Sequence, residues 1–151
     1  MPRFTSSDEL IDFAVAREEE AFVFYAGMAE LVNSDSVRDM FGDFAHEELG
    51  HKAKLLAMKR DGRLVRSEHR IANLKIADAL VPVKPSPEMG YTDALRLAMQ
   101  REKDAFRLYM GLAGAVQDDD TRELFLMLAQ EEAKHKLRFE IEYDDAVMTD
   151  N

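Results

Sequence analysis

The chain has 151 residues, of which 46% are apolar and 33% charged, and its 30 acidic and 20 basic side chains give a formal charge of −10. This length and apolar content fit one globular domain with a sizeable core and exclude a disordered chain. The sequence contains no cysteine, which excludes disulfide frameworks, thiolate zinc sites, cysteine-ligated iron–sulfur clusters and thiol catalysis.

Charge and hydropathy also limit where the protein is expected to be located and what it is expected to bind. No run of uncharged residues exceeds ten, whereas a membrane-spanning helix needs about 18 apolar residues. The first residues, MPRFTSSDELIDF, lack the apolar stretch of a secretory signal. A pI of about 4.9 disfavours nucleic acid and anionic membranes as partners. We therefore expect a cytoplasmic protein that binds neither nucleic acid nor a membrane.

The sequence is an internal repeat. Shifted by 84 residues, it matches itself at 16 of the 36 positions from 17 to 52, without a gap. Each copy contains two segments in which apolar residues recur at steps of three and four, the period of a helix packed on one face. Two copies of a helix pair predict an all-α bundle of four helices. The short connections at 33–35 and 117–119 predict that each pair is antiparallel.

The first repeat covers about residues 6–61. Its two helical seams are Ile11, Ala14, Glu18, Ala21, Tyr25, Met28 and Val32, and then Val37, Phe41, Phe44, Glu48, His51, Leu55 and Met58. Capping boxes are predicted where a Ser or Asp precedes an acidic residue by three positions. The predicted pairs are Ser6 with Glu9, Ser36 with Asp39 and, in the second repeat, Asp120 with Glu123.

A segment of different character, about residues 62–90, follows the first repeat. Two glycines and three prolines interrupt it, and residues 71–80 are predicted to form one short helix. We interpret it as a long crossover between the second and third bundle helices. It is not a domain linker, because neither helix pair alone could bury its seam. Residues 1–151 are therefore predicted to form a single domain.

The second repeat covers about residues 91–147 and has the same two seams. They are Leu95, Ala98, Glu102, Ala105, Tyr109, Leu112 and Val116, and then Thr121, Phe125, Leu128, Glu132, His135 and Phe139. Six polar residues thus occupy positions whose neighbours are apolar: Glu18, Glu48, His51, Glu102, Glu132 and His135. Isolated buried carboxylates cost several kcal/mol each, and no Lys or Arg lies on the seams to offset them.

Helix geometry places these residues at one level of the bundle. Glu18 lies about 21 Å from the turn at Val32, and Glu48 and His51 lie about 18 and 22 Å beyond Ser36, at 1.5 Å per residue. Four carboxylates and two imidazoles suit two transition-metal ions, whose charge of +4 would neutralise the layer. The alternative is a metal-free bundle with a hydrated polar layer.

Other duplicated residues allow a functional and a structural interpretation. Tyr25 and Tyr109 lie two turns beyond Glu18 and Glu102 on the same faces. They are either core aromatics or groups that orient a ligand carboxylate and supply a proton. The duplicated pair Glu47 and Glu131 lies off the seams and is expected to form surface or interhelical ion pairs. His46 and His69 have no counterpart in the other repeat and are expected to be structural or exposed.

The strings EEEAFVFYAGMAE with FGDFAHEELGH, and REKDAFRLYMGLAG with LFLMLAQEEAKH, resemble the rubrerythrin group of the ferritin-like superfamily. The resemblance spans residues 5–145 and implies a ferritin-like four-helix bundle with a di-iron site. The implied iron ligands are Glu18, Glu48, His51, Glu102, Glu132 and His135. Glu48 and Glu132, in the two Glu-x-x-His motifs, are implied as bridging carboxylates.

The resemblance also implies a function. Such proteins reduce hydrogen peroxide with a reduced di-iron centre, and relatives oxidise Fe(II). Rubrerythrins proper append a small iron domain held by four cysteines, so a chain without cysteine needs an external electron-donor protein. Peroxidase-type members also tend to carry an extra carboxylate on the third helix. Here the one-turn neighbours of Glu102 on the inner face are Met99 and Ala105, so the implied ligand set is the symmetric one shared with bacterioferritins.

We therefore expect a di-iron oxidoreductase that reduces peroxide or O2, assisted by Tyr25 and Tyr109. The alternatives are a ferroxidase or iron-storage protein, and a metal-binding structural bundle without redox activity. Manganese or zinc would suit the same ligands. We also expect a homodimer or a higher homo-oligomer.

Overall fold

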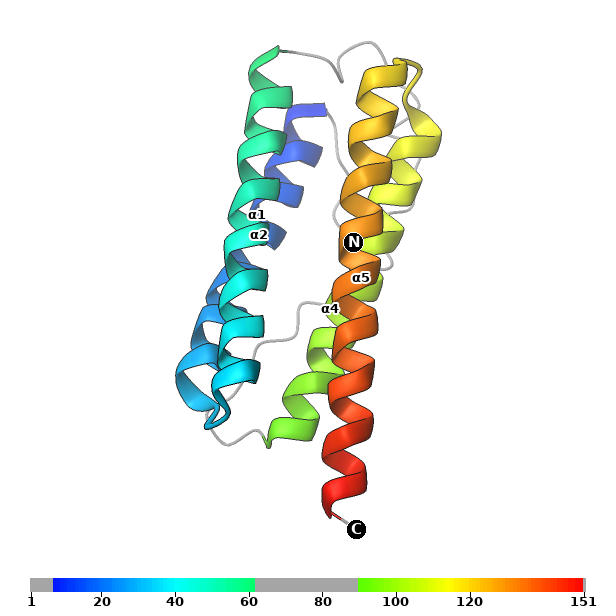
Figure 1. Cartoon of the computed structure of the whole chain (residues 1–151). Helices are drawn as coiled ribbons and strands as arrows, with labels where there is room; N and C mark the ends of the chain where they lie inside the picture. Colours follow the sequence, from blue (N-terminus) through cyan, green and yellow to red (C-terminus); the bar gives the residue numbers. More distant parts are fainter. Residues whose placement is uncertain (1–6, 62–89, 151) are drawn as a thin grey trace. The chain divides into compact units, whose positions relative to one another are not determined.

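A computed structural model of the chain describes residues 7–61 and 90–150. Within these ranges there are four helices and no strand: α1 (Ser7–Leu31), α2 (Asp35–Asp61), α4 (Tyr91–Ala115) and α5 (Asp119–Asp150) (Figure 1). The prediction of an all-α chain with two helices in each repeat is confirmed. The predicted helix at 71–80 and the predicted cap at Ser6 lie outside the described residues.

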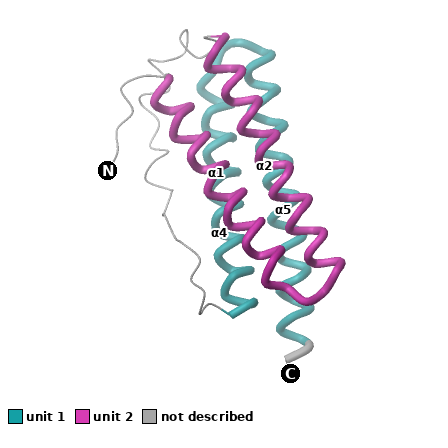
Figure 2. The backbone as a smooth tube through the Cα atoms, turned by 90° about the vertical axis from the view of Figure 1, so that its left-hand side faces the viewer, with its two compact units in different colours: residues 1–3, 73–151 teal, residues 4–72 magenta. Residues whose placement is uncertain are grey.

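The chain divides into two compact units that follow the repeats (Figure 2). One unit contains α1 packed against α2, and the other contains α4 packed against α5. Residues 32–34 and 116–118 are the turns between the paired helices. In each unit the chain reverses at this turn, so the two helices are antiparallel as the short connections predicted (Figure 1).

Each helix buries the apolar stripe that its sequence period predicted. The largest fully buried side chains are Tyr25, Tyr109, Phe41, Phe125, Phe139, Leu10, Leu55, Met58, Leu95 and Leu112. Burying one such side chain contributes roughly 1.5–3 kcal/mol, so tertiary packing stabilises these helices far more than their intrinsic propensity does. These stripes fix which face of each helix points inward.

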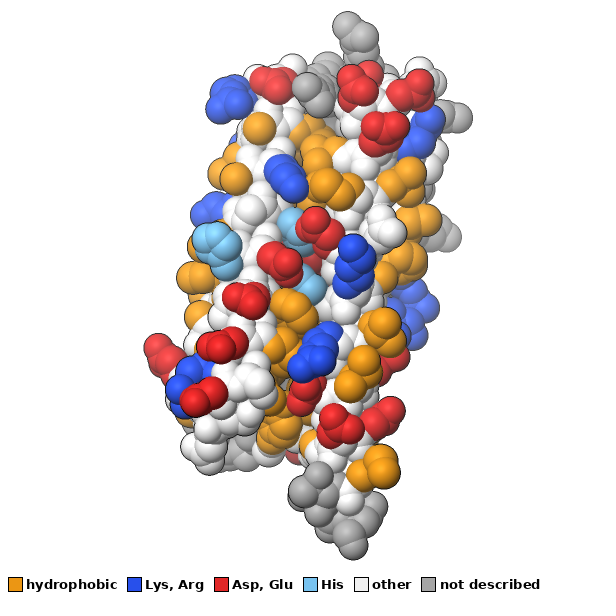
Figure 3. All heavy atoms as spheres, viewed as in Figure 1, with side chains coloured by type: hydrophobic (Ala, Val, Ile, Leu, Met, Phe, Trp, Pro, Cys, Tyr) orange, Lys and Arg blue, Asp and Glu red, His pale blue; other side chains and the backbone are white. Residues whose placement is uncertain are grey.

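On the face shown in Figure 3, charged side chains of both signs alternate with apolar areas. Ion pairs join α1 to α2, among them Lys59 Nζ with Asp12 Oδ1 at 2.7 Å. This hydrogen bond raises the pKa of Lys59 above its ordinary value. None of the four described helices combines the length and the apolar content that crossing a bilayer requires.

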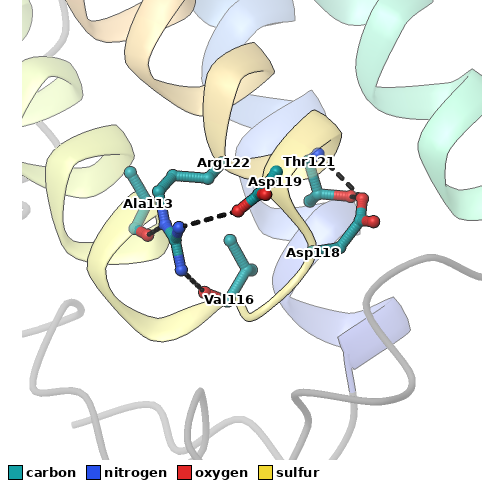
Figure 4. Close-up of polar contacts among 6 residues, drawn as sticks. All are labelled: Ala113, Val116, Asp118, Asp119, Thr121 and Arg122. Carbon is teal, nitrogen blue, oxygen red and sulfur yellow. Dashed lines mark hydrogen bonds and ion pairs between the residues drawn. The ribbon is translucent and has the colours of Figure 1, made fainter.

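The turn before α5 is held by hydrogen bonds from both sides (Figure 4). Asp118 Oδ2 accepts a hydrogen bond from the backbone N–H of Thr121 at 2.9 Å and another from its hydroxyl at 2.6 Å. Arg122 donates to the carbonyl oxygen of Val116 at 2.8 Å and pairs with Asp119 at 3.1 Å. Asp118 therefore caps α5, and Arg122 bonds the end of α4.

The turn before α2 has the same arrangement in a weaker form. Ser34 Oγ accepts a hydrogen bond from the backbone N–H of Val37 at 3.4 Å. Arg38 donates to the carbonyl oxygen of Val32 at 3.4 Å and pairs with Asp35 at 3.1 Å. The internal repeat therefore extends to the hydrogen bonds that set the register of each helix pair.

The predicted caps Ser36 with Asp39 and Asp120 with Glu123 are wrong. Both helices begin earlier than the capping-box pattern indicated, at Asp35 and Asp119. The residue before each of these starts is the one that accepts the backbone hydrogen bond. Several adjacent Ser and Asp residues could each cap the helix. The hydrogen bonds from Arg38 and Arg122 to the end of the preceding helix favour the earlier start.

Asp118→Ala is expected to lower the free energy of unfolding by about 1 kcal/mol, because it removes the cap of α5. Urea denaturation followed by circular dichroism measures the loss. Asp120→Ala, at the neighbouring exposed position, is the matched control and should cost only a few tenths of a kcal/mol. Equal losses in the two variants would show that Asp118 contributes charge near the helix end and no specific cap.

Candidate metal centre

In the first unit, three buried polar side chains meet between α1 and α2. Glu18 comes from α1, and Glu48 and His51 come from successive turns of α2. The His51 Nδ1 atom lies 3.5 Å from Glu18 Oε2 and 3.9 Å from Glu48 Oε1. All three residues are at most 3% exposed, so bulk water cannot stabilise the two carboxylate charges.

The second unit repeats this cluster between α4 and α5. The His135 Nδ1 atom lies 3.6 Å from Glu102 Oε1 and 3.9 Å from Glu132 Oε1. These distances match those of the first unit to within 0.1 Å. We call the two clusters the first triad (Glu18, Glu48, His51) and the second triad (Glu102, Glu132, His135).

The geometry of each triad fits one metal ion. In both triads one ligand atom from each residue lies within 4.8 Å of the others. The imidazole–carboxylate distances exceed those of hydrogen bonds, which are about 2.7–3.2 Å. Ligands bound at about 2.0–2.2 Å from one cation lie roughly 3–3.5 Å apart, close to the distances in the triads.

The donor set also limits the choice of metal. Two carboxylates and one imidazole are hard to borderline ligands, which iron, manganese and zinc all accept. A divalent cation would cancel the two negative charges of each triad when the imidazole is neutral. The structure thus brings together the residues that the sequence predicted within each repeat, and metal binding itself stays a prediction.

Tyr25 and Tyr109 are buried in aromatic surroundings within their own units. The ring of Tyr25 lies edge-on to Phe24 at 5.5 Å and tilted against Phe41 at 6.2 Å. The ring of Tyr109 stacks on Phe125 at 6.3 Å. These contacts support the interpretation as core aromatics, and the proton-supplying role stays a prediction.

Of the other polar residues, His46 and Glu47 are exposed on α2 and Glu131 is half-buried on α5. They lie outside the triads, as their sequence positions indicated. His69 lies outside the described residues.

Sequence reasoning missed two buried charges on α4. Arg101 is 8% exposed and Asp104 is 1% exposed, and Gln100 Nε2 donates a hydrogen bond to Asp104 Oδ1 at 2.9 Å. The equivalent residues of the first repeat are Arg17 and Glu20, whose side chains are 14% and 51% exposed. Because the two repeats carry similar charges here, no sequence signal distinguished the buried pair from its more exposed counterpart.

The fold and the triads agree with the comparison to protein families. The rubrerythrin family model matches residues 9–143, which include both triads and most of each described helix. The chain belongs to the rubrerythrin family. No protein with a curated description matches it.

Two solved structures show the same fold as this rubrerythrin-family chain. A Thermotoga maritima protein, proposed to be a ferritin-like diiron-carboxylate protein, superimposes with a TM-score of 0.80 at 19% identity, covering 97% of this chain and 99% of that protein. A hypothetical protein from Pyrococcus furiosus gives a TM-score of 0.73 at 22% identity, with 91% and 87% covered. The predicted ferritin-like four-helix bundle is thereby confirmed.

Glu48→Gln is expected to stabilise the metal-free protein by about 1 kcal/mol or more. Two carboxylates share one imidazole in the first triad, so even a protonated His51 balances only one of the two buried negative charges. The measurement is the urea midpoint of the chelator-treated protein.

Glu47→Gln, an exposed neighbour on the same helix, is the control and should change stability by less than about 0.5 kcal/mol. A lower midpoint for Glu48→Gln would mean that the triad is already balanced without a metal ion.

Proposed function

We propose that this chain is a di-iron oxidoreductase that reduces hydrogen peroxide or O2, with electrons from an external donor protein. The observation that supports this most is the burial of four carboxylates and two imidazoles as two equivalent triads. A solvated surface cluster would not need metal ions, whereas a buried one gains its charge balance from them. Membership of the rubrerythrin family agrees with iron as the metal.

Each triad would hold one ion. Glu18 and His51 would hold one, and Glu102 and His135 the other. Glu48 and Glu132 would complete the ligand sets of the first and the second triad. The duplicated turns support two equivalent ligand sets, because they place both triads at the same distance along their helix pairs. Two Fe(II) ions would together supply the two electrons that convert one peroxide molecule and two protons into two water molecules.

The protein side chains would position and protect this chemistry. The carboxylates neutralise the ions, and the Glu-x-x-His spacing lets one helix present both ligand types to the same ion. Aromatic rings pack on both Tyr25 and Tyr109, which are buried. Either tyrosine hydroxyl would supply one of the protons that the reduction consumes.

The electrons would come from an external donor protein. The sequence contains no cysteine, so it supplies no thiolate-bound iron of its own to re-reduce the centre. We expect a one-electron carrier that acts twice in each catalytic cycle.

Anaerobic titration is expected to load two Fe(II) ions per chain, and stoichiometric peroxide should oxidise both faster than it oxidises free Fe(II). Optical absorption and stopped-flow kinetics measure the two results. Replacing Glu48 and Glu132 together by alanine should abolish tight binding, because it removes a carboxylate from each triad. Replacing Tyr25 and Tyr109 together by phenylalanine should slow oxidation without changing the iron stoichiometry.

The matched control is the double variant Glu47→Ala with Glu131→Ala, which removes two charges outside the triads. Unchanged iron content in the Glu48 and Glu132 variant would reject the ligand assignment. Oxidation no faster than that of free Fe(II) would reject the redox role.

A second candidate is a ferroxidase or iron-storage protein, in which Fe(II) is the substrate. The symmetry of the two triads favours it, because Met99 and Ala105 leave the inner face of α4 beside Glu102 without a further carboxylate.

Excess Fe(II) with peroxide or O2 separates the two candidates. In the absence of a reductant, the peroxidase is expected to stop after two Fe(II) per chain, because its ions remain bound. A storage protein would continue to oxidise many Fe(II) per chain. Iron oxidised per chain, measured against added Fe(II), decides between them.

A further inference from the structure

A surface groove of about 410 Å³ lies between α4 and α5, within the second unit. Lys103, Phe106 and Arg107 line it from α4, and Ala133, Lys136 and Leu137 line it from α5. Phe106 and Ala133 are half-buried, and Leu137 is 57% exposed. The groove therefore has an apolar floor that solvent reaches.

The charge of the groove is opposite to that of the chain. Three basic side chains line it, and Glu140 is the one acidic residue in its lining. Glu140 forms an ion pair with Lys136. The groove thus has a net charge of +2 in a chain whose formal charge is −10. Basic and hydrophobic side chains lie next to one another along α5 in Figure 3.

The first repeat shows that the fold does not require this charge. Phe22 occupies the position equivalent to Phe106, so the aromatic floor is kept. The equivalents of Lys103 and Arg107 are Glu19 and Val23, and Lys52 pairs with Glu19 at 3.2 Å. Two cations are therefore specific to the second repeat, although the two triads are nearly identical.

The groove also lies beside the second triad. Lys103 follows Glu102 in the chain, Ala133 follows Glu132, and Lys136 follows His135. Consecutive helical residues point about 100° apart. The groove residues therefore occupy the faces next to the triad on the same helical turns.

We propose that this groove docks an acidic helix of a partner protein, with an apolar side chain seated on Phe106 and Leu137. Lys103 and Arg107 are four residues apart, so their charges are separated by about one helical turn, roughly 6 Å. Acidic residues at positions i and i+4 of a partner helix have the same spacing, with an apolar anchor between them. A single small anion would require cations that converge on one point.

The role of the partner rests on the proposed function. If the triads hold iron, the expected occupant is the electron donor, because the groove residues adjoin the second triad on the same helical turns. The docking itself depends only on the shape and the charge of the groove.

The test is a binding measurement on the metal-free protein. The probe is a short fluorescein-labelled helical peptide with leucine anchors flanked by glutamates, titrated by fluorescence anisotropy. We expect saturable binding that weakens as salt is raised. The double variant Lys103→Glu with Arg107→Glu should weaken binding about tenfold or more. Both positions are exposed, and an unchanged urea midpoint would show that the variant folds.

The matched control makes the same charge change at two exposed positions of α2, Lys54→Glu with Arg60→Glu. This variant should bind the peptide with at most a small loss. Equal losses in the two double variants would overturn the proposal, since binding would then follow net charge alone. Equal binding of a peptide with lysines in place of its glutamates would also overturn it.

A small amphiphilic anion is the competing occupant. Octanoate binding that responds to the Lys103 and Arg107 variant, with no peptide binding, would replace the partner helix and overturn the proposal. Because no iron is present in any of these titrations, failure of docking leaves the di-iron proposal untouched. Failure of iron binding likewise leaves the docking result standing.

Discussion

The burial of two carboxylates beside one imidazole is the constraint on which each helix pair depends. Each triad contains two negative charges when its imidazole is neutral, and its residues are at most 3% exposed. The neighbouring seam positions contribute Ala, Phe, Leu and Met, none of which can balance charge. A divalent cation would supply this balance, whereas apolar replacements would give a more stable protein with no site. Stability therefore does not explain the triads, whereas a bound metal ion would.

The turns fix where these charges lie. Arg38 and Arg122 bond the last carbonyl groups of the preceding helices, and Ser34 and Asp118 set the first residues of the following ones. A slip of one residue would rotate every later side chain by about 100° and move the triad residues off the seam. This explains why triad distances agree to within 0.1 Å between units.

The sequence predicted the parts of the structure that a periodic pattern determines. The helix pairs, the buried stripes and the meeting of Glu18 with Glu48 and His51 follow from steps of three and four. The helix caps could not be predicted from the sequence. Several Ser and Asp residues next to each helix start could accept the same backbone hydrogen bond. The burial of Arg101 and Asp104 also could not be predicted, since it depends on what packs against α4.

The two repeats share the features that a metal ion would require, and they differ in the features that a partner would require. Both units keep the same ligands and the same aromatic residue, Phe22 or Phe106, beside them. The outer groove changes from the paired Glu19 and Lys52 to a surface with a net positive charge. Neither the helix packing nor the triad can account for this change, because the first unit has both without it. A recognition role on the second unit would account for it.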